Sequence, residues 1–500
     1  MHYLSTRSES KRITGAEAIV RGQAADGGLY VPESFPEYSL EAINNLVPMS
    51  YSNRAAKIVG KYLTDFSENE LLDYAIAAYE PEIKNADVPE SLAPLHKLDV
   101  TTRFLELWHG PTCAFKDMAL QLMPHLLTAS LIKTGETRTA CILVATSGDT
   151  GKAALEGFSN VRGTKIMVFY PEKGVSDVQK LQMTTQTGDN VNVTAVEGNF
   201  DDAQTGVKTL FSDKDLENDL KRQNHFLSSA NSINWGRLVP QIAYYFSAYC
   251  DLLKNKEITL GDKINFCVPT GNFGNILSAY YAMRMGLPIN KIICASNRND
   301  VLTQFINTGT YDKNRPFYAT ASPSMDILVS SNLERLLYEL SCRDGSAVER
   351  YMSALSEKGS YQVPDSVHKE LNDVFACGYC SEEDTMKTIN ETFDKNSYLI
   401  DTHTAVAYKV LNEYRNMTKD ETISVVVSTA SPFKFCDAVL SALGKPYAGT
   451  GAMLLQALAE ATDQPIPEPL ADLKSKKTRF SDAVPISGMK SAVASFITGG

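Results

Sequence analysis

The sequence predicts an α/β fold in which mostly parallel sheets are covered by helices, with a cap domain at the N-terminus and a helical insertion. Between residues 101 and 310, runs of β-branched and apolar residues alternate with helical patterns. These runs are continuously apolar, which is typical of parallel strands buried on both faces. A chain of 500 residues is long enough for two or three domains with a sizeable core.

The first 100 residues are predicted to form an N-terminal domain of short helices. Helical patterns cover residues 40–46 and 69–79. The segment Gly27-Gly-Leu-Tyr-Val-Pro32 favours a turn that leads into a short strand, because two glycines precede an apolar run that ends on proline. No catalytic motif is visible here, so we interpret this region as packing.

Residues 101–310 are predicted to be the catalytic core, because strands and helices alternate there. Ligands of such sheets bind at the carboxyl ends of the strands. Strands are predicted over residues 140–145, 165–170, 191–196, 263–268 and 292–295. Helices are predicted between them, over residues 150–158, 178–187, 201–211, 239–253 and 276–285.

Residues 311–400 carry many charges and few strand candidates, which predicts a helical insertion or subdomain. Its helices are expected over residues 322–336 and 382–392. The strand pattern then returns once, at residues 423–429. Residues 401–500 are therefore predicted to rejoin the catalytic core and to end in a tail rich in proline and lysine.

The composition is that of an ordinary globular protein, with 43% hydrophobic and 21% charged residues. The net charge of −11 argues against a nucleic-acid partner or a basic membrane-binding surface. No run of about 18 apolar residues occurs, and the first residues lack the pattern of a secretory leader. We therefore expect a cytoplasmic enzyme without membrane or nucleic-acid partners.

The nine cysteines and seven histidines predict neither a disulfide framework nor a metal site. The cysteine count is odd and the spacing irregular. Only Cys377-Gly-Tyr-Cys380 resembles a ligand pair, and without a second pair nearby it favours an incidental spacing over a zinc site.

Most of the predicted chemistry depends on Lys116. A Gly-Pro turn follows the apolar run of residues 104–108, and residues 115–135 have a pattern suited to a buried helix. Lys116 is therefore predicted at a loop-to-helix junction, where the positive end of the helix and partial burial both disfavour its ammonium form. This favours an amine that binds a carbonyl group. An ordinary solvated lysine is the alternative interpretation.

Two glycine-containing loops follow predicted strands, where ligands of such sheets bind. The first is Ala145-Thr-Ser-Gly-Asp-Thr-Gly-Lys152, whose small residues let backbone N–H groups approach an anion at the start of a helix. The second, Pro269-Thr-Gly-Asn-Phe-Gly-Asn275, is the better phosphate-binding candidate, although it lacks the spacing of a nucleotide P-loop. Ordinary strand-to-helix turns are the alternative for both.

Two further segments carry polar side chains in comparable positions. Ser428-Thr-Ala-Ser-Pro432 follows the last predicted strand, and its hydroxyls fit either a helix cap or a partner of a ring nitrogen. Asn231-Ser-Ile-Asn-Trp-Gly-Arg237 precedes an apolar helix and fits either a second anion site or a helix cap followed by a solvated arginine. His109 fits either a donor that faces the substrate or a structural hydrogen-bonding residue.

The order of these features along the chain resembles the fold-type-II enzymes that use pyridoxal 5′-phosphate, the tryptophan-synthase β-like group. Within that group it is similar to the threonine synthase family, and the likeness covers nearly the whole chain. The segments that carry it are His-Gly-Pro-Thr-Cys-Ala-Phe-Lys-Asp at 109–117, Ala-Thr-Ser-Gly-Asp-Thr-Gly at 145–151, Val-Glu-Gly-Asn-Phe-Asp-Asp-Ala at 196–203, Ser-Ile-Asn-Trp-Gly-Arg at 232–237, Pro-Thr-Gly-Asn-Phe-Gly-Asn at 269–275, Ser-Met-Asp-Ile-Leu-Val-Ser-Ser-Asn at 324–332 and Asp-Thr-His-Thr-Ala at 401–405.

The resemblance implies a role for each matching residue. Lys116 matches the catalytic lysine that forms a Schiff base with the cofactor, and Thr429 matches the hydroxyl that meets its pyridine nitrogen. The implied cofactor contacts are Lys116, Ser147, Asp149, Gly271, Asn272, Phe273, Gly274, Asn275 and Thr429. The implied substrate contacts are His109, Thr150, Ser232, Asn234 and Arg237, of which the last two fit the substrate phosphate.

The chain departs from the family pattern at two of these positions. Relatives commonly carry aspartate in place of Asn275, so a negative charge is missing from the site here. Ser431 stands where many relatives have histidine, so a role for that imidazole is absent.

The resemblance implies the last step of threonine biosynthesis, in which O-phospho-L-homoserine and water become L-threonine and phosphate by γ-elimination and β-addition. This is a lyase reaction that depends on pyridoxal phosphate, and it needs two anion sites, one for each phosphate. The expected assembly is a monomer or a homodimer. The alternatives are a threonine or serine dehydratase, a phospho-lyase that eliminates phosphate without adding water, and a non-catalytic sensor on the same scaffold. The presence of Lys116 argues against the sensor.

Overall fold

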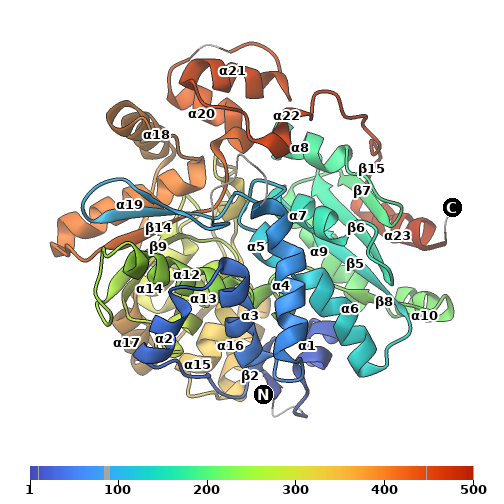
Figure 1. Ribbon diagram of the computed structural model, residues 1–500. Helices are drawn as coiled ribbons and strands as arrows, with labels where there is room; N and C mark the ends of the chain where they lie inside the picture. Colours follow the sequence, from blue (N-terminus) through green and yellow to red (C-terminus); the bar gives the residue numbers. More distant parts are fainter. Residues whose placement is uncertain (9–10, 84–90, 446, 499–500) are drawn as a thin grey trace.

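The computed structural model describes residues 1–8, 11–83, 91–445 and 447–498. Two sheets lie side by side, and helices from the N-terminal region lie across them (Figure 1). None of the helices in the described ranges is long and apolar enough to cross a membrane. The α/β architecture of mostly parallel sheets predicted from the sequence is confirmed.

The N-terminal region connects the two halves of the molecule. Helix α1 packs against α6, beside the smaller sheet, and α3 packs against α12, beside the larger one. The predicted turn at Gly27 leads into strand β2, which pairs antiparallel with β1. The elements here are β1 (Tyr3–Ser5), α1 (Gly15–Arg21), β2 (Tyr30–Pro32), α2 (Leu40–Leu46), α3 (Tyr51–Tyr62) and α4 (Glu68–Ile83).

The smaller sheet has five strands in the order β15-β7-β6-β5-β8, and every pairing in it is parallel. Its strands are β5 (Thr139–Ala145), β6 (Thr164–Pro171), β7 (Val191–Val196), β8 (His225–Ser228) and β15 (Ala483–Val484). The helices associated with it are α5 (Asp117–Leu120), α6 (Met123–Thr134), α7 (Asp149–Phe158), α8 (Asp177–Thr184), α9 (Phe200–Ser212), α10 (Lys214–Arg222) and α23 (Met489–Thr498).

The larger sheet has six strands in the order β13-β10-β9-β14-β4-β3, and only the edge pair β3–β4 is antiparallel. Its strands are β3 (Leu95–Lys97), β4 (Thr102–Glu106), β9 (Ile264–Pro269), β10 (Ile289–Ser296), β13 (Phe375–Tyr379) and β14 (Ser424–Ser428). The helices associated with it are α11 (Trp235–Leu238), α12 (Gln241–Lys254), α13 (Gly274–Arg284), α14 (Val301–Thr308) and α19 (Thr402–Thr418).

The remaining elements lie outside the two sheets. Strands β11 (Thr310–Asp312) and β12 (Ser360–Gln362) form a short antiparallel pair. The helices here are α15 (Leu333–Leu340), α16 (Gly345–Glu357), α17 (Asp365–Val374), α18 (Glu382–Asn396), α20 (Cys436–Ala442), α21 (Met453–Thr462) and α22 (Glu468–Ala471). Helices α20 to α22 lie together at the top of the molecule (Figure 1).

Burial of both faces of each sheet explains why the sequences of the strands are continuously apolar. In β9, Phe266 and Val268 belong to one hydrophobic core, while Cys267 between them belongs to another on the opposite face. In β5, Ile142 and Val144 face the first of these cores, while Leu143 faces a third. Since helices cover both faces of each sheet, apolar residues are required at consecutive positions. The six strands predicted between residues 140 and 429 are confirmed within about three residues.

Three predictions differ from the structure. The helix predicted over residues 322–336 is a 3-10 turn at Pro323–Met325, an irregular stretch, and α15. The helix predicted over residues 115–135 is interrupted between α5 and α6. The region predicted as a helical insertion is mostly helical but also supplies β13, whose residues pair in parallel with β10 of the larger sheet. Strand β13 was not predicted because its central Cys377-Gly378 gives no apolar or β-branched run.

Candidate functional site

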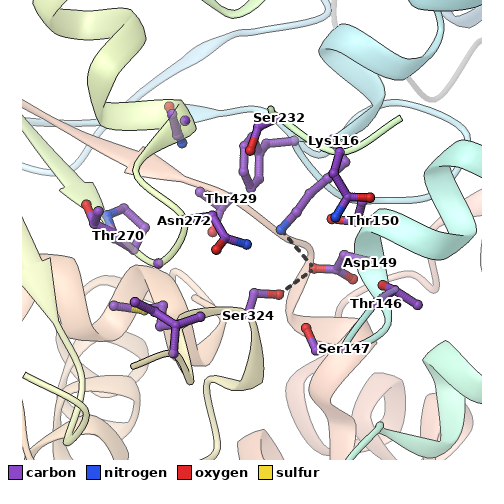
Figure 2. Close-up of a pocket in the computed structure, with 18 of the residues that line it drawn as sticks. Lys116, Thr146, Ser147, Asp149, Thr150, Ser232, Thr270, Asn272, Ser324 and Thr429 are labelled. Carbon is purple, nitrogen blue, oxygen red and sulfur yellow. Dashed lines mark hydrogen bonds and ion pairs between the residues drawn. The ribbon is translucent and has the colours of Figure 1, made fainter. Parts of the chain in front are cut away.

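One cavity lies where the carboxyl ends of strands from both sheets meet. The loops after β5, β9 and β14 line it, together with the loop after β4 that carries Lys116. This is the edge where ligands bind in open α/β sheets. Side chains from all four loops point toward one another in Figure 2.

The loop between β4 and α5 holds Lys116 in a fixed position. Asp117 accepts hydrogen bonds from the N–H of Thr112 at 2.9 Å and from its hydroxyl at 2.7 Å, which closes the Gly-Pro turn. A Cβ atom on Gly110 would lie 2.6 Å from the Asp117 side chain, so the turn requires glycine there. The N–H of Phe115 donates to the carbonyl of Thr429 at 2.8 Å. Lys116 is thereby fixed beside the end of β14.

The Lys116 side chain is buried, with 8% of its surface exposed, and directed into the cavity. Its Nζ lies 3.7 Å from Oδ2 of Asp149 and 4.1 Å from the centroid of the Phe115 ring. Burial lowers the pKa of Lys116 to about 8, since the attraction of Asp149 is opposed by the nearby cations Arg237 and Lys434. About a tenth of the amine is therefore neutral at pH 7 and about half at pH 8, and the neutral form is the nucleophile.

The loop after β5 presents Ser147, Asp149 and Thr150 to the cavity. It is shaped by the Thr146 hydroxyl, which accepts hydrogen bonds from the N–H groups of Gly148 at 2.9 Å and Gly151 at 2.8 Å. Gly148 has a φ of +134°, and a Cβ there would lie 2.5 Å from the Gln179 side chain. Only glycine fits this position.

The loop after β9 leads into the N-terminus of α13 and presents Gly271, Asn272, Phe273, Gly274 and Asn275 to the cavity. Phe273 adopts a left-handed φ of +62°, which turns the chain sharply into the helix. The free backbone N–H groups at this helix start, and the partial positive charge of its N-terminus, suit a phosphate. A Cβ on Gly271 would lie 2.5 Å from the carbonyl oxygen of Ser324, so the loop packs tightly under the segment that faces it.

Asn275 is a donor to the cavity because two tyrosines fix its amide. Its Oδ1 accepts hydrogen bonds from the hydroxyls of Tyr244 at 2.6 Å and Tyr245 at 2.7 Å. Its Nδ2 is buried and has no partner within the described part of the chain. Because Asn275 lines the cavity, this amide can donate to a bound anion.

Arg237 is the second unsatisfied donor. It is 3% exposed and lines the cavity, and its Nε and Nη1 have no hydrogen-bond partner among the described residues. Burial lowers the pKa of Arg237 to about 10, with Tyr244 and Asp117 opposing the shift, so the group stays cationic at neutral pH. A buried guanidinium without a partner is costly, and an anionic ligand offsets that cost.

Twelve of the fourteen residues implied by the sequence line this cavity. They are Lys116, Ser147, Asp149, Thr150, Ser232, Arg237, Gly271, Asn272, Phe273, Gly274, Asn275 and Thr429. Figure 2 shows the amide of Asn272 across the cavity from Lys116.

His109 and Asn234 do not line the cavity. The Nε2 of His109 lies 2.7 Å from a carboxylate oxygen of Glu106, whose other oxygen accepts from Tyr398 at 2.6 Å, and His109 lines a separate hollow. Asn234 caps α11, and its Nδ2 donates to the carbonyls of Ile19 and Ser229. Both side chains therefore have structural partners.

Ser431 is likewise structural. Its hydroxyl accepts from the N–H of Phe433 at 3.3 Å, and its own N–H donates to the carbonyl of Cys113 at 3.0 Å. It lines the same separate hollow as His109.

The sequence analysis gave no role to His403 or Ser324, which also line the cavity. The Nδ1 of His403 lies 2.7 Å from Asp401, and its Nε2 accepts from the N–H of Ser324 at 3.2 Å. The hydroxyl of Ser324 in turn lies 3.4 Å from Asp149. The Asp-Thr-His-Thr segment was visible in the sequence, but only the fold brings it opposite Ser324.

The described residues contain no cluster of three or more histidine, cysteine or acidic side chains that would hold a metal ion. Cys377 and Cys380, whose spacing resembles a ligand pair, are free thiols in the described structure. A reactive lysine, a phosphate-binding helix start and a hydroxyl at the end of β14 together fit the carbonyl, phosphate and ring nitrogen of pyridoxal phosphate.

Family profiles match almost the whole chain. Residues 2–79 match the family described as threonine synthase N terminus, residues 90–429 match pyridoxal-phosphate dependent enzyme, and residues 404–497 match threonine synthase, C-terminal. The chain belongs to the threonine synthase family. The predicted family, fold type II and the cofactor pyridoxal phosphate are thereby confirmed.

Individual members of the family are similar over most of the chain. The threonine synthase of Pseudomonas aeruginosa is 40% identical over 439 residues, which cover 88% of this chain and 90% of that protein. Human threonine synthase-like 1 is also 40% identical over 439 residues, but the chain spans only 58% of its length. The crystal structure of threonine synthase from Brucella melitensis with bound pyridoxal phosphate superimposes with a TM-score of 0.86 and 36% identity, covering 99% of both chains.

Proposed function

We propose that the protein converts O-phospho-L-homoserine and water into L-threonine and phosphate, with Lys116 as the residue that binds the cofactor and carries protons. Membership of the threonine synthase family supports this proposal. The observation that carries it is Arg237, a buried cation with two unpaired nitrogens in the cavity that holds Lys116. Such a group is suited to a phosphorylated substrate, which a simple dehydratase does not use.

The residues of the cavity suggest how the two phosphates are separated. The backbone of residues 271–275 and the start of α13 would hold the cofactor phosphate, and the Thr429 hydroxyl would meet the pyridine nitrogen. A hydroxyl, unlike a carboxylate, does not hold that nitrogen protonated. Arg237 and Ser232 would then bind the substrate phosphate, with the Nδ2 of Asn275 as a neutral donor between the two anions.

When bound, pyridoxal phosphate supplies an electron sink for negative charge that develops on the substrate carbons. Lys116 Nζ takes the proton from Cα and returns one at the end of the reaction. An amine whose pKa is about 8 can do both near neutral pH, because neither form is strongly disfavoured there. Loss of a proton from Cβ releases phosphate from Cγ, where Arg237 takes up its charge, and a proton then added at Cγ forms the methyl group of threonine. Water then adds at Cβ.

The substrate contacts proposed here are Arg237, Ser232 and Thr150, which all line the cavity. His109 and Asn234 are left out, since their side chains are hydrogen-bonded away from it. Thr150 and Ser147 stand at the start of α7, on the side of the cavity opposite Asn272 (Figure 2). This arrangement suits the amino-acid part of the substrate.

The decisive experiment is product analysis after incubation of the cofactor-loaded protein with O-phosphohomoserine. Threonine and inorganic phosphate in equal amounts are expected. Phosphate accompanied by a 2-oxo acid would instead identify the phospho-lyase. A protein that shows no visible absorption after cofactor addition, or shows the same absorption in Lys116→Ala, would refute the role of Lys116.

Location and assembly complete the proposal. Free thiols such as those of Cys377 and Cys380 suit a reducing compartment, which supports the cytoplasm. The net charge of −11 supports a protein without nucleic-acid partners. A monomer or homodimer is proposed, and light scattering of the purified protein tests it.

A further inference from the structure

A second buried lysine, Lys434, lies behind the cavity without lining it. It belongs to the 3-10 turn Pro432–Phe435 that follows β14, and none of its surface is exposed. Its Nζ donates to the carbonyl of Thr112 at 2.8 Å and to Oε1 of Gln182 at 2.7 Å. The third partner is Oδ1 of Asp149, at 3.1 Å. A charged amine buried this completely requires partners of this kind.

Asp149 therefore lies between two lysines. Its Oδ1 faces Lys434 and also accepts from Gln179 at 2.8 Å, while its Oδ2 faces Lys116 at 3.7 Å and Ser324 at 3.4 Å. Burial alone would raise the pKa of Asp149, but Lys434 and then Lys116 reverse this and lower it. The contact with Lys434 is the shorter of the two, and Lys434 lies outside the reacting cavity.

This geometry matters because Lys116 must lose its proton to act as a nucleophile. If Lys116 were the sole counter-ion of Asp149, each deprotonation would leave a buried carboxylate without a partner. The amine would then be held as ammonium. We propose that Lys434 is a positioning residue, a permanent counter-ion that keeps Asp149 ionised and in place while Lys116 is neutral.

Other charged groups around the pair contribute to the balance. Asp401 raises the pKa of Lys116 and Arg237 lowers it, while His403 lowers the pKa of Asp149. Asp401, His403 and Arg237 all lie outside the turn Pro432–Phe435 that carries Lys434. Their effects are therefore held constant when Lys434 alone is changed.

The test uses cofactor-free protein and measures the pH dependence of cofactor uptake at Lys116. Lys434→Met removes the charge at similar length and shape. The rate at which visible absorption develops after pyridoxal phosphate is added, measured between about pH 6.5 and 10.5, reports the fraction of neutral Lys116. The matched control is Lys152→Met. Lys152, in α7, is also buried, but it pairs with Glu156 at 2.6 Å and does not line the cavity.

The midpoint of the uptake profile is expected to rise in Lys434→Met. The two lysine nitrogens contact opposite oxygens of the Asp149 carboxylate, so they are at most about 9 Å apart. At an effective dielectric constant near 20, loss of the repulsion between them raises the midpoint by roughly one pH unit. Loss of the shared counter-ion adds to this shift in the same direction. Uptake at pH 7.5 should fall about tenfold, while Lys152→Met keeps the wild-type midpoint.

An unchanged or lowered midpoint in a folded Lys434→Met protein overturns the proposal, as does an equal shift in Lys152→Met. If the methionine variant does not fold, Lys434→Gln keeps a donor for the Thr112 carbonyl without the charge and must show the same rise. The inference rests on the proposed role of Lys116 as the cofactor-binding amine. Wild-type protein that takes up no cofactor would refute that role, whereas normal wild-type uptake with no shift in the variant refutes only the role of Lys434.

Discussion

Removing the charge of Lys116 should make the cofactor-free protein more stable at neutral pH, although most substitutions of buried residues destabilise. Burial lowers the pKa of Lys116 from 10.5 to about 8. A difference of about 2.5 units between the unfolded and folded states corresponds to roughly 3 kcal/mol of lost stability while both states are protonated. Lys116→Met removes this cost and keeps most of the apolar stem.

The pH dependence follows from the same shift. Below pH 8 the lysine is protonated in both states, so the wild-type protein bears the full cost. Between pH 8 and 10.5 the folded state loses its proton first, and wild-type stability rises with pH. The advantage of Lys116→Met should therefore be largest near pH 7 and disappear above about pH 10.5.

Thermal melting of cofactor-free protein at pH 7 and pH 10 measures the effect. For a chain of 500 residues, about 3 kcal/mol corresponds to a rise in Tm of roughly 3 °C at pH 7. Lys116→Arg is the matched control, because arginine keeps its charge and should lower Tm at both pH values. Two results would refute the conclusion that burial of the Lys116 ammonium destabilises the folded protein. One is a lower Tm for Lys116→Met than for wild type at pH 7, and the other is a difference in Tm that does not change with pH.

Two further predictions test the walls of the cavity, and a third tests the packing of α7 against α5. Arg237→Ala should raise KM for O-phosphohomoserine by at least about tenfold, with cofactor absorption retained, because it removes a charged donor; an unchanged KM would remove Arg237 from the substrate site. Asn275→Asp keeps an acceptor for Tyr244 but adds a negative charge beside the bound anions. The Kd for inorganic phosphate should therefore rise several-fold, and an unchanged Kd would show that this side chain faces away from the anion. Gly157→Ala would place a Cβ 2.1 Å from the Leu120 carbonyl oxygen and separate α7 from α5, so a lower Tm is expected, and an unchanged Tm would contradict this packing.

Local patterns in the sequence predicted most of the elements. Strands β5, β6, β7, β9, β10 and β14 follow from continuously apolar runs, because both faces of each strand are buried. Strand β13 was missed, since its Cys-Gly-Tyr-Cys end gives no such run and only its neighbour β10 decides that it is a strand. The segment 322–336 has a helical pattern but forms an α-helix only from Leu333, and the carbonyl of Ser324 packs against Gly271 instead.

The sequence by itself predicted a reactive amine at Lys116, the loops that end the strands and the family to which the chain belongs, because each depends on residues that are adjacent in the chain. Only the tertiary structure decided which polar side chains reach the cavity. His109 is held by Glu106, whose carboxylate also binds the distant Tyr398, and Asn234 is held by the distant carbonyl of Ile19. His403 and Ser324 are brought into the cavity from two separate segments. The pairing of Lys434 with Asp149 joins residues 285 positions apart, from 149 to 434, and depends on complete burial. Burial and long-range pairing set the protonation of Lys116, and no local pattern contains them.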